Sequence, residues 1–299
     1  MEITLLGAGL LGGAIGERLL RCGHGLTVWN RSPQRCEPLL ALGARPAATP
    51  AEAVAAAEAV VAVLSDGATT RAVLLEQAGS ALAGRLVVQV ATIAPAESEA
   101  LATALAERGA TLLETPVLGS RPEALAGTLQ LMVGGEAAAL ERARPLLEAL
   151  GGEPHHLGPV GAALQTELAL NQLIASLTHS FSLSLHLVQR AGVEVEAFMA
   201  ILRASALYAP TFDKKLAKEL ADDYANPNFP TAHLRKDLHL FLEAARQQGI
   251  ETLGLEGLAR LLERAGPAGL DGLDYSALHR LTAGSPDDLA TVRTRPVSR

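Results

Sequence analysis

A glycine-rich segment near the start of the chain could hold the phosphates of a nucleotide. Gly7-Ala8-Gly9-Leu10-Leu11-Gly12 has the spacing G-x-G-x-x-G, follows a short apolar run and precedes a helical pattern. In this pattern Gly7 allows a tight turn, Gly9 lets the backbone approach a pyrophosphate, and Gly12 lets helix and strand pack closely. The helix N-terminus, from Leu10 and Leu11 onward, supplies N–H donors. The segment therefore predicts dinucleotide binding, and a βα turn without a nucleotide is the alternative.

The second apolar run ends in residues that distinguish two dinucleotides. A site for NAD usually has Asp or Glu here, whose carboxylate accepts from the ribose 2′-hydroxyl. This chain has Asn30, Arg31 and Ser32 instead. A guanidinium can pair with a 2′-phosphate, and Ser32 can add a hydroxyl. We therefore expect NADP rather than NAD, and a solvated loop charge at Arg31 is the alternative.

The first half of the chain alternates apolar runs with helical patterns. The expected strands are Ile3–Leu6, Leu26–Trp29, Ala59–Leu64, Leu86–Val90, Thr111–Glu114 and Leu129–Val133. The expected helices are Leu10–Arg21, Pro33–Leu42, Thr69–Ala78, Pro95–Glu107 and Glu136–Leu150. Strands that alternate with helices predict βαβ units and a parallel sheet.

The pattern changes near Gly158. A long helical pattern runs from about Ala162 to Ala191, and no convincing strand follows it. We therefore expect an α/β Rossmann-type N-terminal domain, residues 1–158, and an all-α C-terminal domain, residues 159–299, with the active site in the cleft between them. A polar end from about Gly284 is expected to be a loose tail.

Composition excludes several classes of protein. Hydrophobic residues make up 49% of the 299 residues and charged residues 19%, which is typical of a globular protein. The net charge of −7 provides no basic field for a nucleic acid. Two cysteines are too few for a disulfide framework, and we see no signal peptide or membrane-spanning run, so a cytoplasmic setting is expected. No metal site is expected, because His155 and His156 lack a third ligand.

Several blocks of sequence, in order and at matching spacing, resemble the β-hydroxyacid dehydrogenase family, which includes 3-hydroxyisobutyrate dehydrogenases. Leu64 and Ser65 match the family's cofactor loop, Thr92 lies in its S-T-x-x-P segment, and Lys236-Asp237-Leu238 matches its K-D-L block. The resemblance implies that these residues contact the cofactor, that Leu118, Gly119 and Ser120 form the substrate loop, and that Asp274-Tyr275-Ser276-Ala277 matches the closing D-x-S-A. It also implies at least a homodimer.

One block departs from the family at the position that matters most for chemistry. The family pattern G-x-V-G-x-x-x-x-x-K-x-x-x-N places a general acid/base lysine ahead of an asparagine. Here Gly158-Pro159-Val160-Gly161 is followed by Glu167 and Asn171, and no lysine precedes Lys214. Glu167 and Asn171 share a helix face because they are four residues apart. A serine of the family's substrate loop is also replaced, by Leu118.

Three functions remain open after this departure. In the first, a buried, protonated Glu167 donates a proton to the carbonyl of a small substrate, and Asn171 holds the substrate oxygen. In the second, ionised Glu167 stabilises an iminium, as suits an imine reductase; imine reductases resemble this family and also lack the lysine. In the third, the protein binds cofactor without turnover, as a scaffold or sensor. A solvated helix charge is the alternative for Glu167 itself, and the segment Asp213–Asp223 is expected to be a solvated helical face.

Overall fold

The computed structural model describes residues 1–284, so the expected loose tail lies outside the described residues. The chain divides into two compact units, of which the first is Met1–Ala169 and the second begins at Leu170. The sequence-based domain boundary after Gly158 stays a prediction.

The first unit is built on a sheet whose central strands are parallel and buried. In chain order the strands are β1 (Glu2–Leu6), β2 (Gly25–Trp29), β3 (Arg45–Pro46), β4 (Ala59–Ala62), β5 (Leu86–Gln89), β6 (Thr111–Glu114), β7 (Val117–Leu118), β8 (Gln130–Gly134) and β9 (His155–Gly158). Their spatial order is β3-β2-β1-β4-β5-β6-β8-β7, and β9 pairs with β8. From β1 the chain adds β2 and β3 on one side and then β4, β5 and β6 on the other, all parallel, and this switch in strand order is the topology of a nucleotide-binding sheet.

The sheet is not parallel throughout, which corrects the expectation from sequence. Strand β8 runs antiparallel to β6 and to β7, while β9 runs parallel to β8. Strands β3, β7 and β9 were not predicted, because two-residue strands carry no periodicity and β9 begins with His155 and His156. The mixed edge is a common addition to an otherwise parallel sheet.

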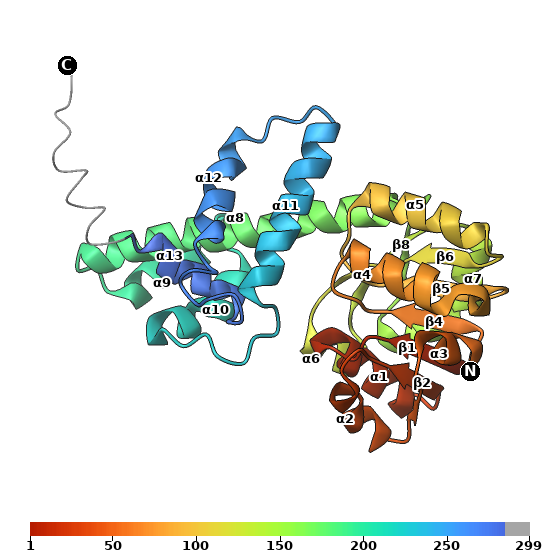
Figure 1. Ribbon diagram of the computed structural model, residues 1–299. Coiled ribbons are helices and arrows are strands. Elements are labelled where there is room, and N and C mark those ends of the chain that lie inside the picture. Colours follow the sequence, from red (N-terminus) through yellow and green to blue (C-terminus); the bar gives the residue numbers. More distant parts are fainter. Residues whose placement is uncertain (285–299) are drawn as a thin grey trace. The chain divides into compact units, whose positions relative to one another are not determined.

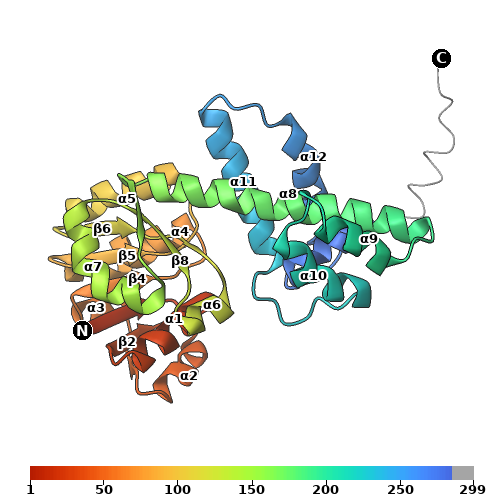
Figure 2. The same ribbon diagram turned by 180° about the vertical axis from the view of Figure 1, so that it is seen from behind.

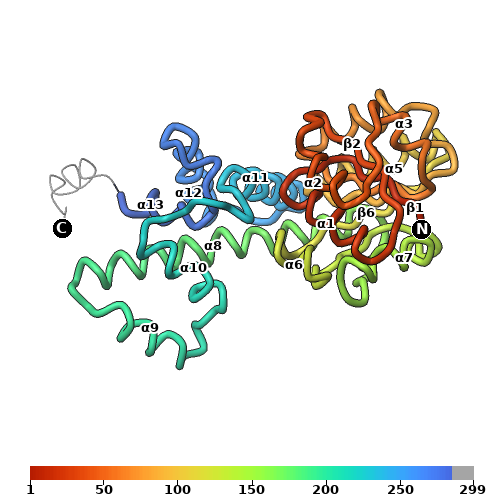
Figure 3. Tube along the Cα trace, turned by 90° about the horizontal axis from the view of Figure 1, so that it is seen from below, coloured from red at the N-terminus to blue at the C-terminus, as the bar shows by residue number. Residues whose placement is uncertain are grey.

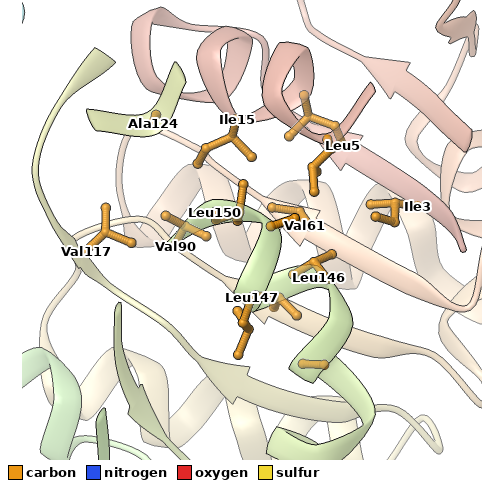
Figure 4. Packing of buried hydrophobic residues seen from close by; sticks show 14 of the residues in the cluster. Ile3, Leu5, Ile15, Val61, Val90, Val117, Ala124, Leu146, Leu147 and Leu150 are labelled. Carbon is orange, nitrogen blue, oxygen red and sulfur yellow. The ribbon is translucent and has the colours of Figure 1, made fainter. Parts of the chain in front are cut away.

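Helices cover both faces of this sheet (Figures 1 and 2). They are α1 (Leu10–Arg21), η1 (Pro33–Cys36), α2 (Glu37–Leu40), α3 (Pro50–Ala55), α4 (Gly67–Arg71), the π-helical turn η2 (Ala72–Ala78), η3 (Gly79–Leu82), α5 (Pro95–Ala106), α6 (Arg121–Ala126) and α7 (Ala137–Leu150). Figure 4 shows one face, where Ile3, Leu5 and Val61 of the sheet pack against Ile15 of α1 and Leu146 of α7. On the other face, Val60 and Val87 pack with Val54, Leu74 and Leu101. Strand residues alternate between these two cores, as the two-residue period of a strand requires.

The second unit contains only helices within its described part. It comprises α8 (Ala162–Arg190) from Leu170 onward, then α9 (Val195–Arg203), α10 (Pro210–Ala221), α11 (Thr231–Gln247), α12 (Leu253–Glu263), η4 (Tyr275–Ala277) and α13 (Leu278–Thr282). In Figure 3 the chain leaves α8 and returns through α9 and α10, where Phe181, Leu185, Met199 and Phe212 form one core. A second core joins α11, α12 and α13. An α/β Rossmann-type unit followed by an all-α unit confirms the predicted fold class.

The segment Asp213–Asp223 is not a solvated face throughout, so that expectation is wrong for two of its residues. Lys215 is buried and pairs with Asp274, with Nζ at 2.8 and 3.0 Å from the carboxylate oxygens. Its ammonium also lies 4.2 Å from the centre of the Tyr275 ring. Glu219, one turn further along α10, is 4% exposed. The local sequence of charged residues does not show that one of them, Lys215, is buried in an ion pair with the distant Asp274.

Candidate active site

The glycine-rich turn joins β1 to α1, and two of its glycines are required by the protein's own packing. Gly7 has φ of +102°, a conformation that L side chains rarely adopt. A Cβ on Gly7 would lie 2.2 Å from the Val63 carbonyl oxygen, and one on Gly12 would lie 2.0 Å from the Gly7 carbonyl oxygen. Because Gly7 and Gly12 have no side chain, β1 and α1 can approach this closely, as the sequence pattern predicts.

Gly9 is different, because the protein itself leaves space beside it. The nearest atom to a Cβ on Gly9 would be Arg35 Nη1, at 4.0 Å. Leu10, the first residue of α1, is 48% exposed, whereas the side chain of Leu11 packs against the core below. The space above Gly9 and the start of α1 is what a pyrophosphate needs to meet backbone N–H groups. The turn therefore fits a dinucleotide.

Asn30 fastens this turn to the end of β2. Its Oδ1 accepts from Ala8 N at 3.0 Å, and its Nδ2 donates to Ser32 O at 2.9 Å. Arg31 and Ser32 are exposed beside it. A cavity of about 420 Å³, lined by Arg31 and Glu52 among others, adjoins the same strand end. Asn30 thus orders the phosphate turn, while the guanidinium of Arg31 is placed where a ligand can reach it.

The loop after β4 is ordered by its own side chains. Leu64 packs against the core, and Ser65 Oγ lies 2.6 Å from Asp66 Oδ2 and 3.2 Å from Thr69 Oγ1. Asp66 caps α4 by accepting from Thr69 N at 2.7 Å. The exposed Ser65 therefore sits on a rigid turn rather than a loose one.

The structure brings together two residues that the sequence placed in separate blocks. Thr92, which follows β5, donates from Oγ1 to Oε1 of Glu167 at 2.7 Å. Glu167 lies in the second turn of α8 and is only 3% exposed. A solvated helix charge is therefore the wrong description of Glu167. A buried carboxyl group held by a neighbouring hydroxyl is the arrangement that acid/base chemistry uses.

The expected substrate loop is partly a strand and partly a helix cap. Leu118 is half-buried in β7, and Gly119 has φ of +129°. A Cβ on Gly119 would lie 2.8 Å from Leu129 Cδ2. Ser120 N and Oγ each lie 2.8 Å from Glu123 Oε2, and Ser120 is the N-cap of α6. The side chain that replaces the family's serine is thus apolar, and the Ser120 hydroxyl is engaged in a cap.

In the second unit, Asn171 and Lys236 both contact a buried aspartate that sequence reasoning did not single out. Asn171 Nδ2 donates to Asp237 Oδ2 at 3.0 Å, and Lys236 Nζ lies 3.2 Å from Asp237 Oδ1. Asp237 is 2% exposed. Burial raises the pKa of Asp237, while Lys236 and Asn171 oppose that rise. Its position in the block Lys236-Asp237-Leu238 was the available signal.

A second missed residue is Glu114 at the end of β6. It is fully buried, and its two carboxylate oxygens accept from Gly161 N and Leu164 N, both at 2.9 Å. A carboxylate at the end of an otherwise apolar strand was a signal in the sequence, but nothing in the sequence indicated that its partners would be Gly161 and Leu164.

Two family descriptions match nearly all of the described chain. Residues 2–158 match the NAD binding domain of 6-phosphogluconate dehydrogenase. Residues 161–282 match the NAD-binding of NADP-dependent 3-hydroxyisobutyrate dehydrogenase. The chain belongs to the β-hydroxyacid dehydrogenase family. This family of NAD(P)-dependent oxidoreductases is the one that the sequence blocks predicted.

Curated members of the family align with the chain over almost its whole length. It is 29% identical to glyoxylate/succinic semialdehyde reductase 1 of Arabidopsis thaliana, covering 93% of this chain and 97% of the relative. It is 33% identical to the NAD-dependent L-serine dehydrogenase of Pseudomonas aeruginosa, covering 94% and 97%. It is also 28% identical to the human cytokine-like nuclear factor N-PAC, covering 93% of this chain and 51% of that protein.

Solved structures of other proteins share the fold. Mycobacterium tuberculosis 3-hydroxyisobutyrate dehydrogenase with L-serine has a TM-score of 0.84 at 24% identity, over 95% of this chain and 99% of that one. The imine reductase of Myxococcus stipitatus with NADP+ has a TM-score of 0.65 at 24% identity, over 94% and 99%. At these identities the likeness concerns the fold alone.

Two further features bear on the class of protein. Among residues 1–284, no helix combines the length and apolar character that crossing a membrane requires. Over the same residues, no group of three or more His, Cys, Asp or Glu side chains is arranged to hold a metal ion.

Proposed function

We propose that this family member is an NADP(H)-dependent reductase of small carbonyl compounds, in which Glu167 replaces the usual lysine as proton donor. The observation that carries the proposal is the 2.7 Å hydrogen bond from Thr92 to a Glu167 that is 3% exposed. Burial disfavours the ionised form of a carboxyl group, so we propose that Glu167 acts in its protonated form.

The geometry indicates how the proton would move. A bound dinucleotide supplies the hydride that the carbonyl carbon accepts. Because Thr92 donates to Oε1 of Glu167, the acidic proton of that carboxyl group would lie on Oε2. From there Glu167 would protonate the developing alkoxide, while the amide of Asn171, four residues further along α8, would hold the same oxygen. Thr92 is therefore a positioning residue for the acid.

The loss of the lysine's positive charge also narrows the substrate class, because neither a protonated nor an ionised Glu167 attracts a substrate carboxylate. If both groups were ionised, a substrate carboxylate about 4 Å from Glu167 would be repelled by roughly 4 kcal/mol at an effective dielectric of about 20. That is about a thousandfold in affinity. The apolar Leu118 offers such a carboxylate no hydrogen bond. We therefore propose neutral aldehydes or ketones as substrates rather than 3-hydroxyacids.

Arg31 supports NADP over NAD. Its guanidinium is exposed just after β2, next to the turn that would hold the pyrophosphate. None of the three positions 30 to 32 is Asp or Glu. A 2′-phosphate would gain a charge-assisted pair there. Ser65 on the neighbouring loop, and Lys236 by family resemblance, are further proposed cofactor contacts.

The test is NADPH consumption against a panel of neutral ketones, small aldehydes, semialdehydes bearing a carboxylate, and cyclic imines. The wild type is compared with Glu167→Ala and with Glu251→Ala, an exposed glutamate outside the site. Turnover of a neutral carbonyl that collapses only in Glu167→Ala supports the proposal. Tight NADPH binding without turnover of any substrate would instead favour a scaffold or sensor.

Imine reduction is the second candidate. A hydroxyl that donates to Glu167, as Thr92 does, also suits an ionised carboxylate. A carboxylate there would stabilise an iminium, which accepts a hydride more readily than a neutral carbonyl. Preferential turnover of the cyclic imines in the same panel would select this function.

We also propose that the protein forms a homodimer through its second unit. Large apolar side chains are exposed along α8 and α9 and just after them: Leu183 at 51%, Leu187 at 71%, Ile201 at 73% and Leu207 at 79%. Leu183 and Leu187 are four residues apart, so they share one face of α8, and a contiguous exposed apolar face is typical of an interface. Light scattering should give twice the chain mass, and Leu187→Glu with Ile201→Glu should give a monomer. Leu42→Glu, at an exposed leucine of the first unit, should leave the mass unchanged.

A further inference from the structure

The start of α8 is capped by a residue far away in the sequence. Glu114, at the end of β6, is 0% exposed. Its Oε2 accepts from Gly161 N and its Oε1 from Leu164 N, both at 2.9 Å. The first turn of α8 contains no acidic residue of its own. Glu114 therefore supplies the acceptors, and the negative charge, that the N-terminus of this helix requires.

The carboxylate is held in one position by the backbone around it. A Cβ on Gly134 would lie 2.9 Å from Glu114 Oε1 and 2.9 Å from the Pro159 carbonyl oxygen. Gly134 ends β8, the neighbour of β6. No side chain larger than hydrogen fits between this strand and the carboxylate without moving one of them. The contact between Glu114 and α8 is therefore closely packed as well as hydrogen-bonded.

This cap lies one helical turn before the proposed acid. Leu164, whose N–H binds Glu114, is three residues ahead of Glu167, a rise of about 4.5 Å along the helix. A shift of the first turn would carry Glu167 with it and lengthen its 2.7 Å bond to Thr92. A hydrogen bond between two oxygen atoms weakens beyond about 3.0 Å, so only a small movement of Glu167 would keep its bond to Thr92.

We propose that Glu114 is a positioning residue for the reaction: it fixes the first turn of α8 so that Glu167 stays in hydrogen-bond contact with Thr92. This inference rests on the proposed function of Glu167 as the acid. It assigns Glu114 no contact with substrate.

The principal test is Glu114→Gln, which keeps the size of the side chain but replaces one acceptor oxygen by an amide donor. We expect kcat to fall by about 10- to 100-fold, the range given by losing one hydrogen bond to a charged acceptor. KM and the Kd of NADPH should change by less than about 3-fold, because neither depends on the position of Glu167. In the Glu167→Ala background the same substitution should have almost no further effect.

Gly134→Ala is the second variant, since it displaces the carboxylate without removing it. It should lower kcat in the same way. Thr49→Ala is the control: Thr49 caps α3 by accepting from Glu52 N at 3.1 Å, and α3 carries no residue proposed for the site. Its loss should lower stability without changing kcat. Equal losses of kcat from Glu114→Gln in the wild-type and Glu167→Ala backgrounds would overturn the inference.

Hydrogen exchange gives a readout that needs no turnover. In Glu114→Gln, amides between Gly161 and Glu167 should exchange about 10-fold faster or more, while those of α3 should not change. If the wild type turns nothing over, the proposed function fails, and the anchoring of α8 is judged by exchange alone. Unchanged exchange at the start of α8 in Glu114→Gln overturns the inference whatever the activity.

Discussion

The hydroxyl of Thr92 donates to Oε1 of Glu167 across 2.7 Å, joining the segment after β5 to the second turn of α8. The sequence pointed to both residues: Thr92 as a cofactor contact, and Glu167 as the residue that replaces the family's lysine. Their contact gives the replacement a structural partner, because the threonine hydroxyl donates to a carboxyl oxygen, whereas it could only accept from a lysine ammonium.

Thr92→Val should lower kcat by about 10-fold, because it removes one hydrogen bond of about 1.4 kcal/mol and keeps the side-chain shape. A change in the Kd of NADPH would measure separately the cofactor contact that the family resemblance assigns to Thr92. Thr92→Ser should retain most of the activity, since it restores the donor. Steady-state kinetics together with fluorescence titration of NADPH measure both quantities. A Val variant as active as the Ser variant would contradict the orienting role.

Arg31 and Asn30 are adjacent but should affect the two dinucleotides differently. Arg31→Ala should weaken NADPH by about 10- to 100-fold and NADH by less than about 3-fold, because only NADPH carries the 2′-phosphate. Asn30→Ala should weaken both by a similar factor of about 10, since its Oδ1 holds the Ala8 N–H of the shared phosphate turn. Calorimetric titration of each variant with each dinucleotide tests the pair. An equal loss of both dinucleotides in Arg31→Ala would remove the reason for preferring NADP.

Substitutions at Gly9 and Gly12 should affect different properties: cofactor binding at Gly9 and stability at Gly12. Gly9→Ala should leave the free energy of unfolding nearly unchanged, because its new Cβ has no neighbour closer than 4.0 Å, yet it should weaken NADPH by about 10-fold or more. Gly12→Ala should destabilise the fold by roughly 2 kcal/mol or more, since its Cβ would lie 2.0 Å from a carbonyl oxygen. Urea unfolding and NADPH titration distinguish the two. A Gly9→Ala variant that binds normally would place the pyrophosphate elsewhere.

Regular elements and the glycine turn were predictable because their signals are local. The helix Leu10–Arg21 and the strand Thr111–Glu114 have the predicted bounds, since each has an apolar period and a clear end. The predicted Pro33–Leu42 helix is instead a 3₁₀ turn followed by the short α2, and the predicted Thr69–Ala78 helix ends in a π-helical turn. Local patterns do not distinguish these helix types.

The site contacts were not predictable because they join distant segments. The partners Thr92 and Glu167 are 75 residues apart, and Glu114 and Gly161 are 47 apart. Family blocks identified Glu167 as a departure and Asn171 as the matching asparagine, but they did not indicate that Asp237 would bind Asn171. The burial of Lys215 was missed for the same physical reason, since Asp274 lies 59 residues further along.

A buried acidic cluster in the second unit gives the protein an unusual dependence on pH. Glu219 is 4% exposed near the ion pair of Lys215 and Asp274. Burial raises the pKa of Glu219 to about 8, with Asp274 adding to the rise and Lys215 opposing it. With Glu219 neutral, the ammonium and the Asp274 carboxylate balance each other. Ionising Glu219 would leave an excess negative charge in the interior.

This pKa predicts that stability falls as pH rises. Between the ordinary glutamate pKa of 4.5 and about 8, the unfolded chain releases the Glu219 proton while the folded chain keeps it, so unfolding becomes easier. The slope for one group is about 1.4 kcal/mol per pH unit. Buried His279, whose pKa is lowered to about 4 by burial and by His186, gives an opposite slope below pH 6.5. The loss should therefore be seen between about pH 6.5 and about pH 8.

Glu219→Gln should remove this loss, because an amide has no proton to release in the same range. Its free energy of unfolding in urea should exceed that of the wild type by an amount that grows up to about pH 8 and then levels off. Glu243→Gln, at a glutamate on α11 for which no contact with the cluster is found in the described part of the chain, should keep the wild-type slope. Parallel curves for the wild type and Glu219→Gln across this range would mean that Glu219 is ionised in the folded protein.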